Sequence, residues 1–518
     1  MILRRSVAIV LLFLAAPLLF ADAPGVYAIT GGTVHPVSGP DIPNGTVVIR
    51  NGLIESVGSG VSIPSDATVI DVKGAHIYPG LIDAQTFLGF TTPKRGDKSA
   101  EPTPDALAVR NAKISDDDAS AGRNLGVTTV LTAPTSGIFN GQSAIINLGS
   151  GPIESRVIKS PASTQIAFNT RPTWTYPDSL MGVMSYIRQE LMDAQQHQAA
   201  RSLYERSPAG LRRPADDAQL EALQPALTRQ LPVVFVADSA SMIRRAQTLA
   251  KEFNLKLIIA GARQAYQMPD ELKGVPLLVS VKWDTAPTDK EDREDQPLRV
   301  IRDRQLQPTT PSVLAKAGVE FALVSSPGKA GDYFGGIRKA IENGLTAEQA
   351  LRATTLAPAR IFGIERQLGS LERGKIANVI VSDKPIFEKA SKVTRVFIDG
   401  REMHLPAEEK KAAATAAAPI DGTWALTVRA PQGNVSMSVT LKASDGKLAG
   451  TFSGDRGSGE IRGGSIDGTA FEFTISANAQ NEAEATDWLF KGTLAESNMT
   501  GTVSTTLGTF EFSGSKSE

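Results

Sequence analysis

The sequence predicts an α/β fold: a (β/α)8 TIM-type barrel flanked by a composite small β-sheet domain and followed by a C-terminal all-β domain. Three observations support it. Short β-rich runs fill residues 27–72, apolar strands alternate with helical stretches from residue 80 to about 369, and closely spaced strands fill residues 420–518. Repeated strand–helix alternation predicts a parallel sheet buried on both faces, most simply a closed barrel.

Residues 1–23 have the pattern of a secretory signal peptide. Two arginines precede an uncharged apolar stretch over residues 7–20, and Ala21-Asp22-Ala23 offers a small-x-small cleavage site. We therefore expect a periplasmic or secreted protein with no membrane attachment after cleavage. The rival interpretation, an uncleaved N-terminal anchor, is disfavoured because the apolar stretch is short for a membrane span.

Composition narrows the classes of function. The 518 residues include 54 Lys and Arg against 55 Asp and Glu, a net charge of −1, so no nucleic-acid partner is expected. The chain has no cysteine. Thiolate catalysis, disulfides and cysteine-based metal sites are therefore excluded.

The N-terminal β-rich part is predicted to form a small sheet. Asn51-Gly52 between two apolar runs is a strong hairpin signal. Strand patterns return at 377–381 and 393–398, after the helical region ends. We therefore expect the two ends to pair into one composite domain, formed by residues 24–79 and 369–405.

The barrel is expected over residues 80–368. Its eight strand candidates are Leu81–Phe87, Val127–Leu131, Ala144–Leu148, Gln165–Phe168, Val233–Val236, Lys256–Ala260, Leu277–Val281 and Val319–Val324. Thr346-Ala347-Glu348-Gln349 predicts a capping box at the start of one of the closing helices.

The last part of the chain is predicted to be a separate β domain. Glu-Glu-Lys-Lys followed by an Ala/Thr run indicates a linker over residues 406–418. Residues 419–518 then alternate apolar and polar positions between frequent turns. This pattern is typical of an antiparallel barrel or sandwich.

From about residue 27 to 404 the chain resembles the amidohydrolase superfamily, in particular its exported imidazolonepropionase-like members. The resemblance is carried by Asn51-Gly52-Leu53-Ile54, Tyr78–Ala84, Ala340–Gly363 and Leu368–Ala377. It implies one or two divalent metals, zinc as the usual one, at the C-terminal mouth of the barrel. It also implies a metal-bound water that attacks a polarised amide carbonyl, and so hydrolysis of carbon–nitrogen bonds other than peptide bonds.

The positions that the resemblance assigns to metal ligands hold other residues. The first-strand pair falls on Gln85 and Phe87, which share one face of a strand. Strands five, six and eight place Val236, Ala260 and Ser326 at the ligand positions. Gln is a poor zinc ligand and Phe is none, so no metal cofactor is predicted.

The histidines of the chain do not restore such a site. The four are His35, His76, His197 and His404, and none is expected at a barrel strand end. An isolated histidine is more often a surface or capping residue than a ligand.

Several polar residues follow predicted strands, where barrel enzymes place their chemistry. Asp238 and Lys282 are the candidates for a metal-free acid/base pair, although the N-cap of a helix is the favoured role for Asp238-Ser239. The candidates for substrate binding are Gln85, Thr132, Arg263, Ser325 and Ser326. The charged stretch 284–304 is either a lid or a solvated loop.

Three hypotheses of function follow. The first is a metal-free, catalytically degenerate barrel that serves as a binding or partner subunit, as a homo-oligomer or a heteromer with an active paralogue. The second is a hydrolase of non-peptide carbon–nitrogen bonds, using a partner's metal or the acid/base pair. The third is a small-molecule-binding module centred on the C-terminal β domain. Fold alone does not choose among them.

Overall fold

A computed structural model gives two compact units, residues 1–406 and 407–518. The residues that it describes are 25–90, 103–134, 137–170, 176–287, 290–325, 330–405, 420–430, 433–444, 447–455, 457–467, 469–478, 485–495, 497–505 and 508–517. The predicted signal peptide, the linker and Ser326 lie outside these residues.

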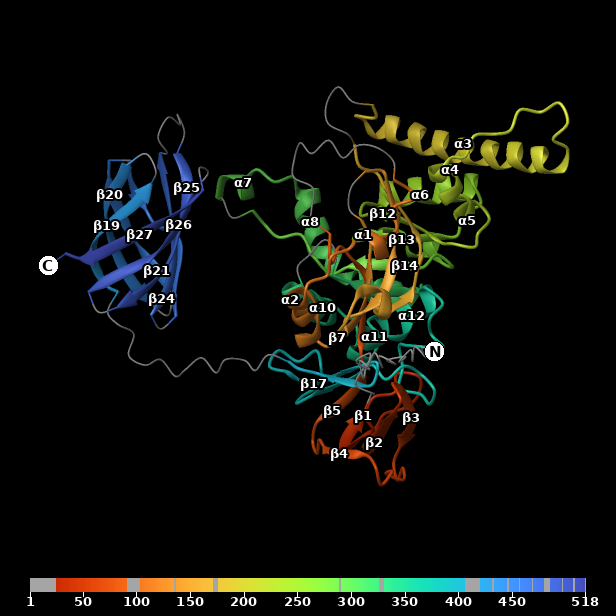
Figure 1. Ribbon diagram of the computed structural model, residues 1–518, viewed down its shortest axis with the longest axis horizontal. Coiled ribbons are helices and arrows are strands. Elements are labelled where there is room, and N and C mark those ends of the chain that lie inside the picture. Colours follow the sequence, from red (N-terminus) through yellow and green to blue (C-terminus); the bar gives the residue numbers. More distant parts are fainter. Residues whose placement is uncertain are drawn as a thin grey trace, which may run out of the picture. The chain divides into compact units, whose positions relative to one another are not determined.

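The composite sheet forms as predicted, from both ends of the first unit (Figure 1). Its order is β18-β17-β16-β5-β1-β2-β3, with β4 beside β1. The strands are β1 (Tyr27–Val34), β2 (Ile42–Arg50), β3 (Leu53–Gly58), β4 (Thr68–Asp71), β5 (His76–Pro79), β16 (Val379–Ser382), β17 (Val393–Ile398) and β18 (Arg401–Met403). Asn51 and Gly52 both have positive φ, the conformation that a tight hairpin turn requires.

The barrel wall has eight strand positions. Strands β6 and β7 pair in parallel, as do β11 to β15 in succession. The strands of the wall and its edge are β6 (Leu81–Thr86), β7 (Val127–Thr132), β8 (Phe139–Gln142), β9 (Ala144–Asn147), β10 (Val157–Lys159), β11 (Thr164–Ala167), β12 (Val233–Ala237), β13 (Leu257–Gly261), β14 (Leu277–Ser280) and β15 (Phe321–Val324).

The third position of the wall is reversed, which the prediction of a uniformly parallel barrel missed. β9 pairs antiparallel with β7, and β8, one residue before it, pairs antiparallel with β11. Only residues 133–138 connect β7 to β8. A parallel return needs a crossover of a dozen or more residues, so this connection forces the strand to run back down the wall.

A buried carboxylate helps to close the barrel between its last and first strands. The backbone N–H of Ser325, just after β15, donates to Asp83 Oδ1 of β6 at 3.2 Å. Asp83 is 4% exposed, and burial raises its pKa to about 6 against hydrogen bonds that lower it.

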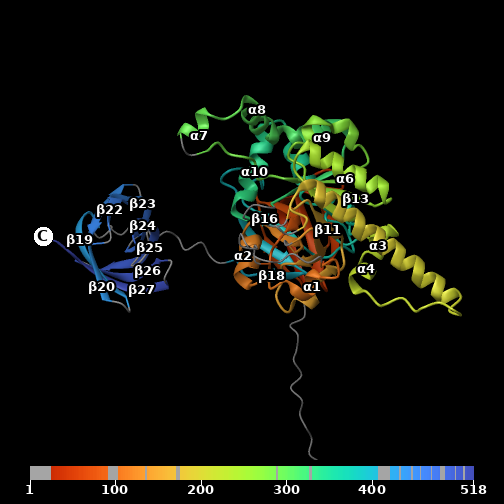
Figure 2. The ribbon, with the colours of Figure 1, turned by 90° about the horizontal axis from the view of Figure 1, so that it is seen from above.

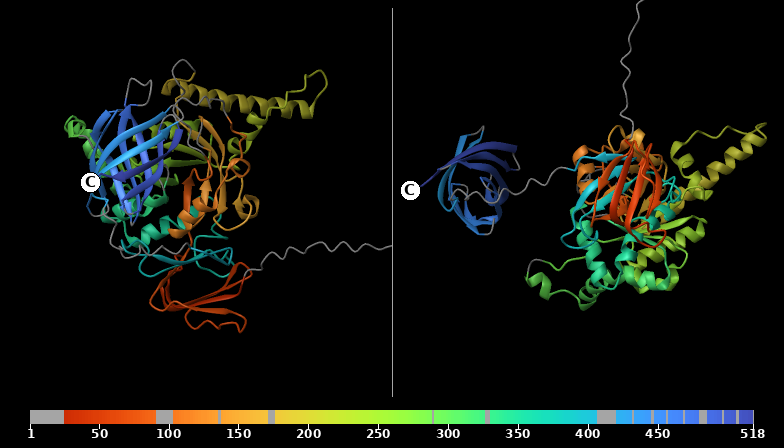
Figure 3. Two further views of the ribbon diagram at one scale, coloured as in Figure 1. Left: turned by 60° about the vertical axis from the view of Figure 1, so that its left-hand side comes forward. Right: turned by 90° about the horizontal axis from the view of Figure 1, so that it is seen from below.

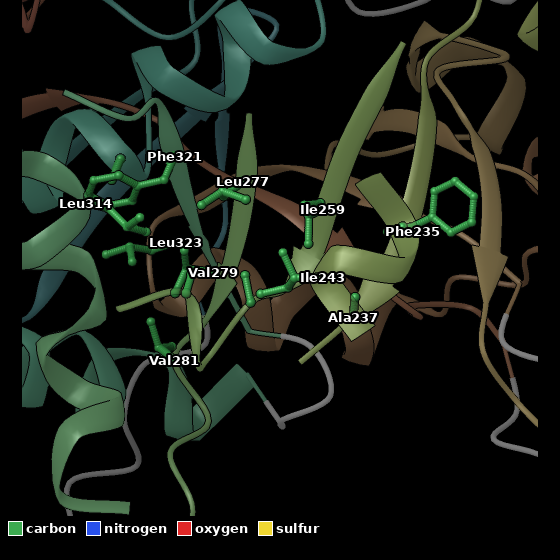
Figure 4. Close-up of a cluster of buried hydrophobic side chains, with 14 of the residues drawn as sticks. Phe235, Ala237, Ile243, Ile259, Leu277, Val279, Val281, Leu314, Phe321 and Leu323 are labelled. Carbon is green, nitrogen blue, oxygen red and sulfur yellow. The ribbon is translucent and has the colours of Figure 1, made fainter. Parts of the chain in front are cut away.

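Alternate side chains of the wall pack inward and outward. Phe235, Ile259, Leu277 and Leu323 belong to the outer core, where Ile243 of α6 and Leu314 of α9 also pack (Figure 4). Val234, Ile258, Leu278 and Ala322 belong to the inner core. Nearly every position is apolar because both faces of these strands are buried.

Helices surround the barrel strands (Figure 2). They are α1 (Ala108–Asn111), α2 (Asp116–Asn124), α3 (Leu180–Arg206), α4 (Ala218–Ala222), α5 (Gln224–Leu227), α6 (Ala240–Glu252), α7 (Lys290–Glu294), α8 (Leu298–Leu306), α9 (Thr310–Ala317), α10 (Ala330–Glu342), α11 (Ala347–Ala353) and α12 (Leu356–Ile361). The 3-10 helices are η1 (Ile153–Arg156), η2 (Ala265–Gln267), η3 (Pro269–Leu272) and η4 (Gln307–Thr309).

Two helix starts agree with their sequence signals. Thr346 and Gln349 form the predicted capping box of α11. Ser239 caps α6 through Met242 N, a role that the sequence had offered to the Asp238-Ser239 pair. Within the part of the chain that the structure describes, no helix is both long and apolar enough to span a membrane.

The second unit contains a closed antiparallel barrel of eight strands (Figure 3). The pairing of β20 with β21 closes it, and β22 pairs only with β21. The strands are β19 (Gly422–Ala430), β20 (Gly433–Ser444), β21 (Lys447–Gly454), β22 (Gly457–Glu460), β23 (Arg462–Asp467), β24 (Ala470–Asn478), β25 (Ala485–Ala495), β26 (Asn498–Thr505) and β27 (Gly508–Lys516). Trp424 is fully buried among aromatic side chains, and its indole N–H donates to Ile420 O.

Replacement of Asp83 by Asn tests the buried carboxyl. The native pKa of about 6 exceeds the ordinary 3.8, so the stability that protonated Asp83 contributes is present below pH 4 and is lost as pH rises through 6. Asn keeps an acceptor for Ser325 N and cannot ionise. The unfolding free energy of Asp83→Asn relative to wild type should therefore rise by about 2 kcal/mol between pH 4 and pH 7.

Urea unfolding at several pH values measures this difference. The exposed Asp105→Asn variant controls for the loss of one negative charge. A difference between Asp83→Asn and wild type that stays constant over this pH range would contradict the account.

Candidate functional site

The candidate site lies at the end of the barrel where its parallel strands terminate. Strands β6, β7 and β11 to β15 all run toward this end. Barrel enzymes place their reactive groups here, in the connections that follow the strands. The described side chains at this end form a buried polar chain, an apolar layer and a charged rim.

The buried polar chain begins where β6 departs from regular pairing. The register with β7 shifts between Asp83 and Thr86, and Gln85 lies within that irregularity. Its amide Nε2 donates to Gln165 Oε1 of β11 at 3.2 Å. Gln165 is in register with Val234, which belongs to the inner core, so the two amides meet inside the barrel.

The chain continues from β11 into the reversed strand. Gln165 Nε2 donates to Ser163 Oγ at 2.9 Å, and the hydroxyls of Ser163 and Ser143 are 2.6 Å apart. Gln85 and Gln165 are each 2% exposed, and both serines are fully buried. Gln85 Oε1 has no hydrogen-bond partner among the described residues.

An apolar layer lies beside this chain. Ala167 is in register with Val236, and Val236 with Ala260. Val236 and Ala260 pack in the inner core with Val324. The positions predicted from the fifth and sixth ligand strands thus carry side chains with no donor atom.

The residues at these positions do not fit a catalytic zinc ion. Such an ion takes three nitrogen or oxygen ligands from the protein and keeps an open position. Gln85 supplies one neutral amide oxygen, whereas Phe87, Val236 and Ala260 supply none. Among the residues that the structure describes, no group of three or more His, Cys, Asp or Glu residues is placed to hold a metal.

The rim is formed by an ion-pair network that centres on Arg263, just after β13. Its Nε and Nη2 donate to the two carboxylate oxygens of Asp238 at 3.0 and 3.1 Å, and its Nη1 to Asp284. Burial lowers the pKa of Arg263, but the hydrogen bonds that it donates to Asp238, together with the negative charges of Asp238 and Asp284, outweigh burial and raise this pKa. Gly261 gives Asp238 room, because a Cβ there would lie 2.6 Å from Asp238 Oδ1.

The network extends to α8 and η4. Gln307 Nε2 donates to Asp284 Oδ2 and to Asp303 Oδ2, both at 2.8 Å. Tyr266 donates its hydroxyl proton to Asp303 Oδ1. The rim side chains are therefore held by one another before any ligand arrives.

The two residues of the proposed acid/base pair, Asp238 and Lys282, make different contacts in the structure. Asp238 is engaged by Arg263 through both oxygens, and the Lys282 side chain is exposed. Lys282 contacts the network through its backbone carbonyl, which accepts from Arg263 Nη1 at 3.3 Å. The catalytic roles of Asp238 and Lys282 stay predictions.

The predicted binding residues lie in different parts of the structure. Gln85 and Arg263 lie in the polar chain and the rim. Thr132 uses its hydroxyl to bond Leu88 O at 2.6 Å, and Ser325 presents its backbone N–H to Asp83. Ser326 lies outside the described residues.

The sequence prediction missed Gln165, Ser163 and Ser143. Gln165 began a predicted strand, and one signal was available: an amide in a strand that is otherwise apolar on both faces. Its partner, 80 residues away in the chain, could not be read from that pattern.

The chain is similar to amidohydrolases of known structure. The model of the Amidohydrolase family matches residues 307–403. The crystal structure of an amidohydrolase from Thermotoga maritima is 26% identical, with a TM-score of 0.64, and the match covers 73% of this chain and 99% of that one. A prolidase solved with N-methylphosphonate-L-proline is 20% identical, with a TM-score of 0.48 and coverages of 73% and 99%.

A double-mutant cycle tests the amide pair. Gln165→Leu leaves the buried Gln85 amide unpaired and should lower the unfolding free energy by about 1–3 kcal/mol. In Gln85→Leu/Gln165→Leu both amides are gone, so the loss should fall short of the sum of the single losses by about 1 kcal/mol.

Urea unfolding of the four proteins gives the coupling. Gln85→Leu combined with Gln307→Leu is the control pair, since these two side chains share no hydrogen bond. Additive losses for Gln85 and Gln165 would show that the amides do not interact.

Proposed function

Because the chain belongs to the amidohydrolase superfamily, we propose that it is a metal-free binding protein built on that fold. Its barrel binds a small molecule and does not activate water on a metal ion. The proposal includes a role as a binding or partner subunit, in a homo-oligomer or beside an active paralogue. Residues 1–23 support export to the periplasm or the medium.

The observation that carries the proposal is the free oxygen of Gln85. A buried acceptor without a partner costs about 1–3 kcal/mol of stability. A ligand that brings an N–H or O–H donor to Gln85 Oε1 would remove that cost on binding. The amide pair is thus suited to a neutral polar group, whereas an imidazole pair at 85 and 87 would suit a cation.

The apolar layer supports the same proposal. Val236 and Ala260 line the interior next to Gln165, so the barrel offers hydrocarbon contact together with a few fixed polar groups. That combination is typical of small-molecule sites.

The hydrolase alternative depends on the rim. Hydrolysis of a non-peptide carbon–nitrogen bond without a metal would need Asp238 or Lys282 to exchange a proton with a substrate. Arg263 occupies both oxygens of Asp238, so this alternative requires the ion pair to open. A metal supplied by a partner would need ligands from that partner.

The third hypothesis, a small-molecule-binding module centred on the C-terminal β domain, has less support. The interior of the C-terminal barrel is filled by side chains such as Trp424, Phe473 and Phe490. Small barrels packed in this way leave no ligand cavity inside. A ligand of this domain would therefore bind its outer surface.

Metal analysis tests the proposal. Protein purified without chelator should hold far less than one zinc ion per chain by inductively coupled plasma mass spectrometry. Gln85 is the one potential donor among the four described ligand positions, and a single neutral amide oxygen does not hold a zinc ion. Added zinc should therefore bind wild type no more tightly than Gln85→Leu. One zinc per chain, lost in Gln85→Leu, would overturn the proposal.

A further inference from the structure

A second cavity lies away from the barrel mouth, between the composite sheet and helices α10 and α11. Its volume is about 360 Å³. Tyr78 in its wall belongs to β5, and β5 is followed in the chain by β6, the first strand of the barrel. The cavity therefore lies near the N-terminal end of the barrel strands. The lining residues are His35, Asp41, Tyr78, Ile341, Ala347, Glu348, Leu351, Pro385, Ile386, Phe387 and Glu388.

One wall of this cavity is fixed by a chain of polar side chains. Asp41 Oδ1 lies 2.9 Å from His35 Nδ1, and His35 Nε2 lies 2.9 Å from His76 Nδ1. The parallel pairing of β1 with β5, with Thr33 opposite His76, brings the two imidazoles together. Burial and the neighbouring His35 lower the pKa of His76, which favours its neutral form.

The ring of Tyr78 stacks on His35, with centroids 4.3 Å apart and planes 5° apart. Tyr78 is 3% exposed, and its hydroxyl accepts from Ile386 N at 3.4 Å. No acceptor for the Tyr78 hydroxyl proton lies among the described residues. A buried donor at the cavity wall is thus left for a water molecule.

The charge of the lining is negative. Asp41 is paired with His35, but Glu348 and Glu388 have no hydrogen-bond or ion-pair partner within the described part of the chain. The flanking Lys384 and Lys389 do not line the cavity. Two carboxylates therefore line the same cavity without a compensating cation among the described residues.

The rest of the lining is apolar. Leu351, Ile386 and Phe387 are buried, and Ile341 is partly buried. A cavity of this volume accommodates roughly ten non-hydrogen atoms. An apolar wall combined with unpaired carboxylates suits a ligand with a hydrocarbon body and a positive end.

We propose that this cavity is a second binding site and that it takes a small organic ammonium ion with an apolar body. Glu348 and Glu388 hold the charged end, and the walls formed by Tyr78, Leu351 and Phe387 hold the body. The Asp41–His35–His76 chain fixes the Tyr78 wall. This site does not depend on the function proposed for the barrel mouth.

Isothermal titration of the full chain at pH 7.5 with three probes of one shape tests the charge requirement. The probes are 2-phenylethylamine, which is cationic, 2-phenylethanol, which is neutral, and 3-phenylpropionate, which is anionic. The amine should bind at least about tenfold more tightly than the alcohol, and the acid should not bind. Equal affinity for amine and alcohol, or no binding of the amine at millimolar concentration, would refute the site.

Variants locate the binding. Glu348→Gln/Glu388→Gln should weaken amine binding at least about tenfold and leave alcohol binding unchanged. Glu342→Gln is the matched control, because Glu342 lies on α10 and does not line the cavity. Both glutamates are exposed, so the double variant should keep the wild-type melting temperature. Unchanged amine affinity in the double variant would place the binding elsewhere.

Discussion

The hydrogen bond between Gln85 and Gln165 organises the interior of the barrel. It joins the first strand to the strand that follows the reversed one, across the interior where a metal would otherwise gather side chains. An amide can donate and accept at once, so the pair ties two strands together and still leaves Gln85 Oε1 free. The interior at this level of the barrel is therefore polar and organised by the two amides.

The reversed strand positions the far end of this polar chain. Because β8 runs antiparallel to β11, Ser143 lies beside Ser163: Ser143 N donates to Ser163 O, and Ala162 N donates to Ser143 O. Gln165 then finds Ser163 two residues before it on the same face. The short connection after β7 therefore has a consequence for the site as well as for topology.

Much of the fold could be predicted from the sequence because its signals are local. Apolar runs with helical stretches between them identified the barrel strands, and Asn51-Gly52 and Thr346–Gln349 form their turn and capping box as expected. The direction of the third strand was missed, because an apolar run shows that a strand exists but not which way it runs.

The site was less predictable because its contacts are remote in sequence. Loss of ligands at Gln85, Val236 and Ala260 is visible in the chain itself. Gln85 contacts Gln165, and His35 contacts His76, although the partners are 80 and 41 residues apart in the sequence. Both contacts depend on how distant strands pair. His35 and His76, interpreted singly as surface or capping residues, form a chain with Asp41 only after β1 and β5 pair.

The barrel mouth and the second cavity differ in what they offer a ligand. The mouth combines neutral amides with an apolar layer and a rim whose charges are paired among themselves. The cavity beside α11 has carboxylates that lack partners in the described part of the chain. The ligands proposed for the two places therefore differ in charge, neutral at the mouth and cationic at the cavity.

The most direct test of the central claim is a crystal structure of the protein grown with millimolar zinc, with diffraction recorded above and below the zinc absorption edge. The account predicts no anomalous peak beside Gln85 and Gln165, and a water or small molecule within hydrogen-bonding distance of Gln85 Oε1. A full-occupancy zinc peak coordinated at that position would contradict it.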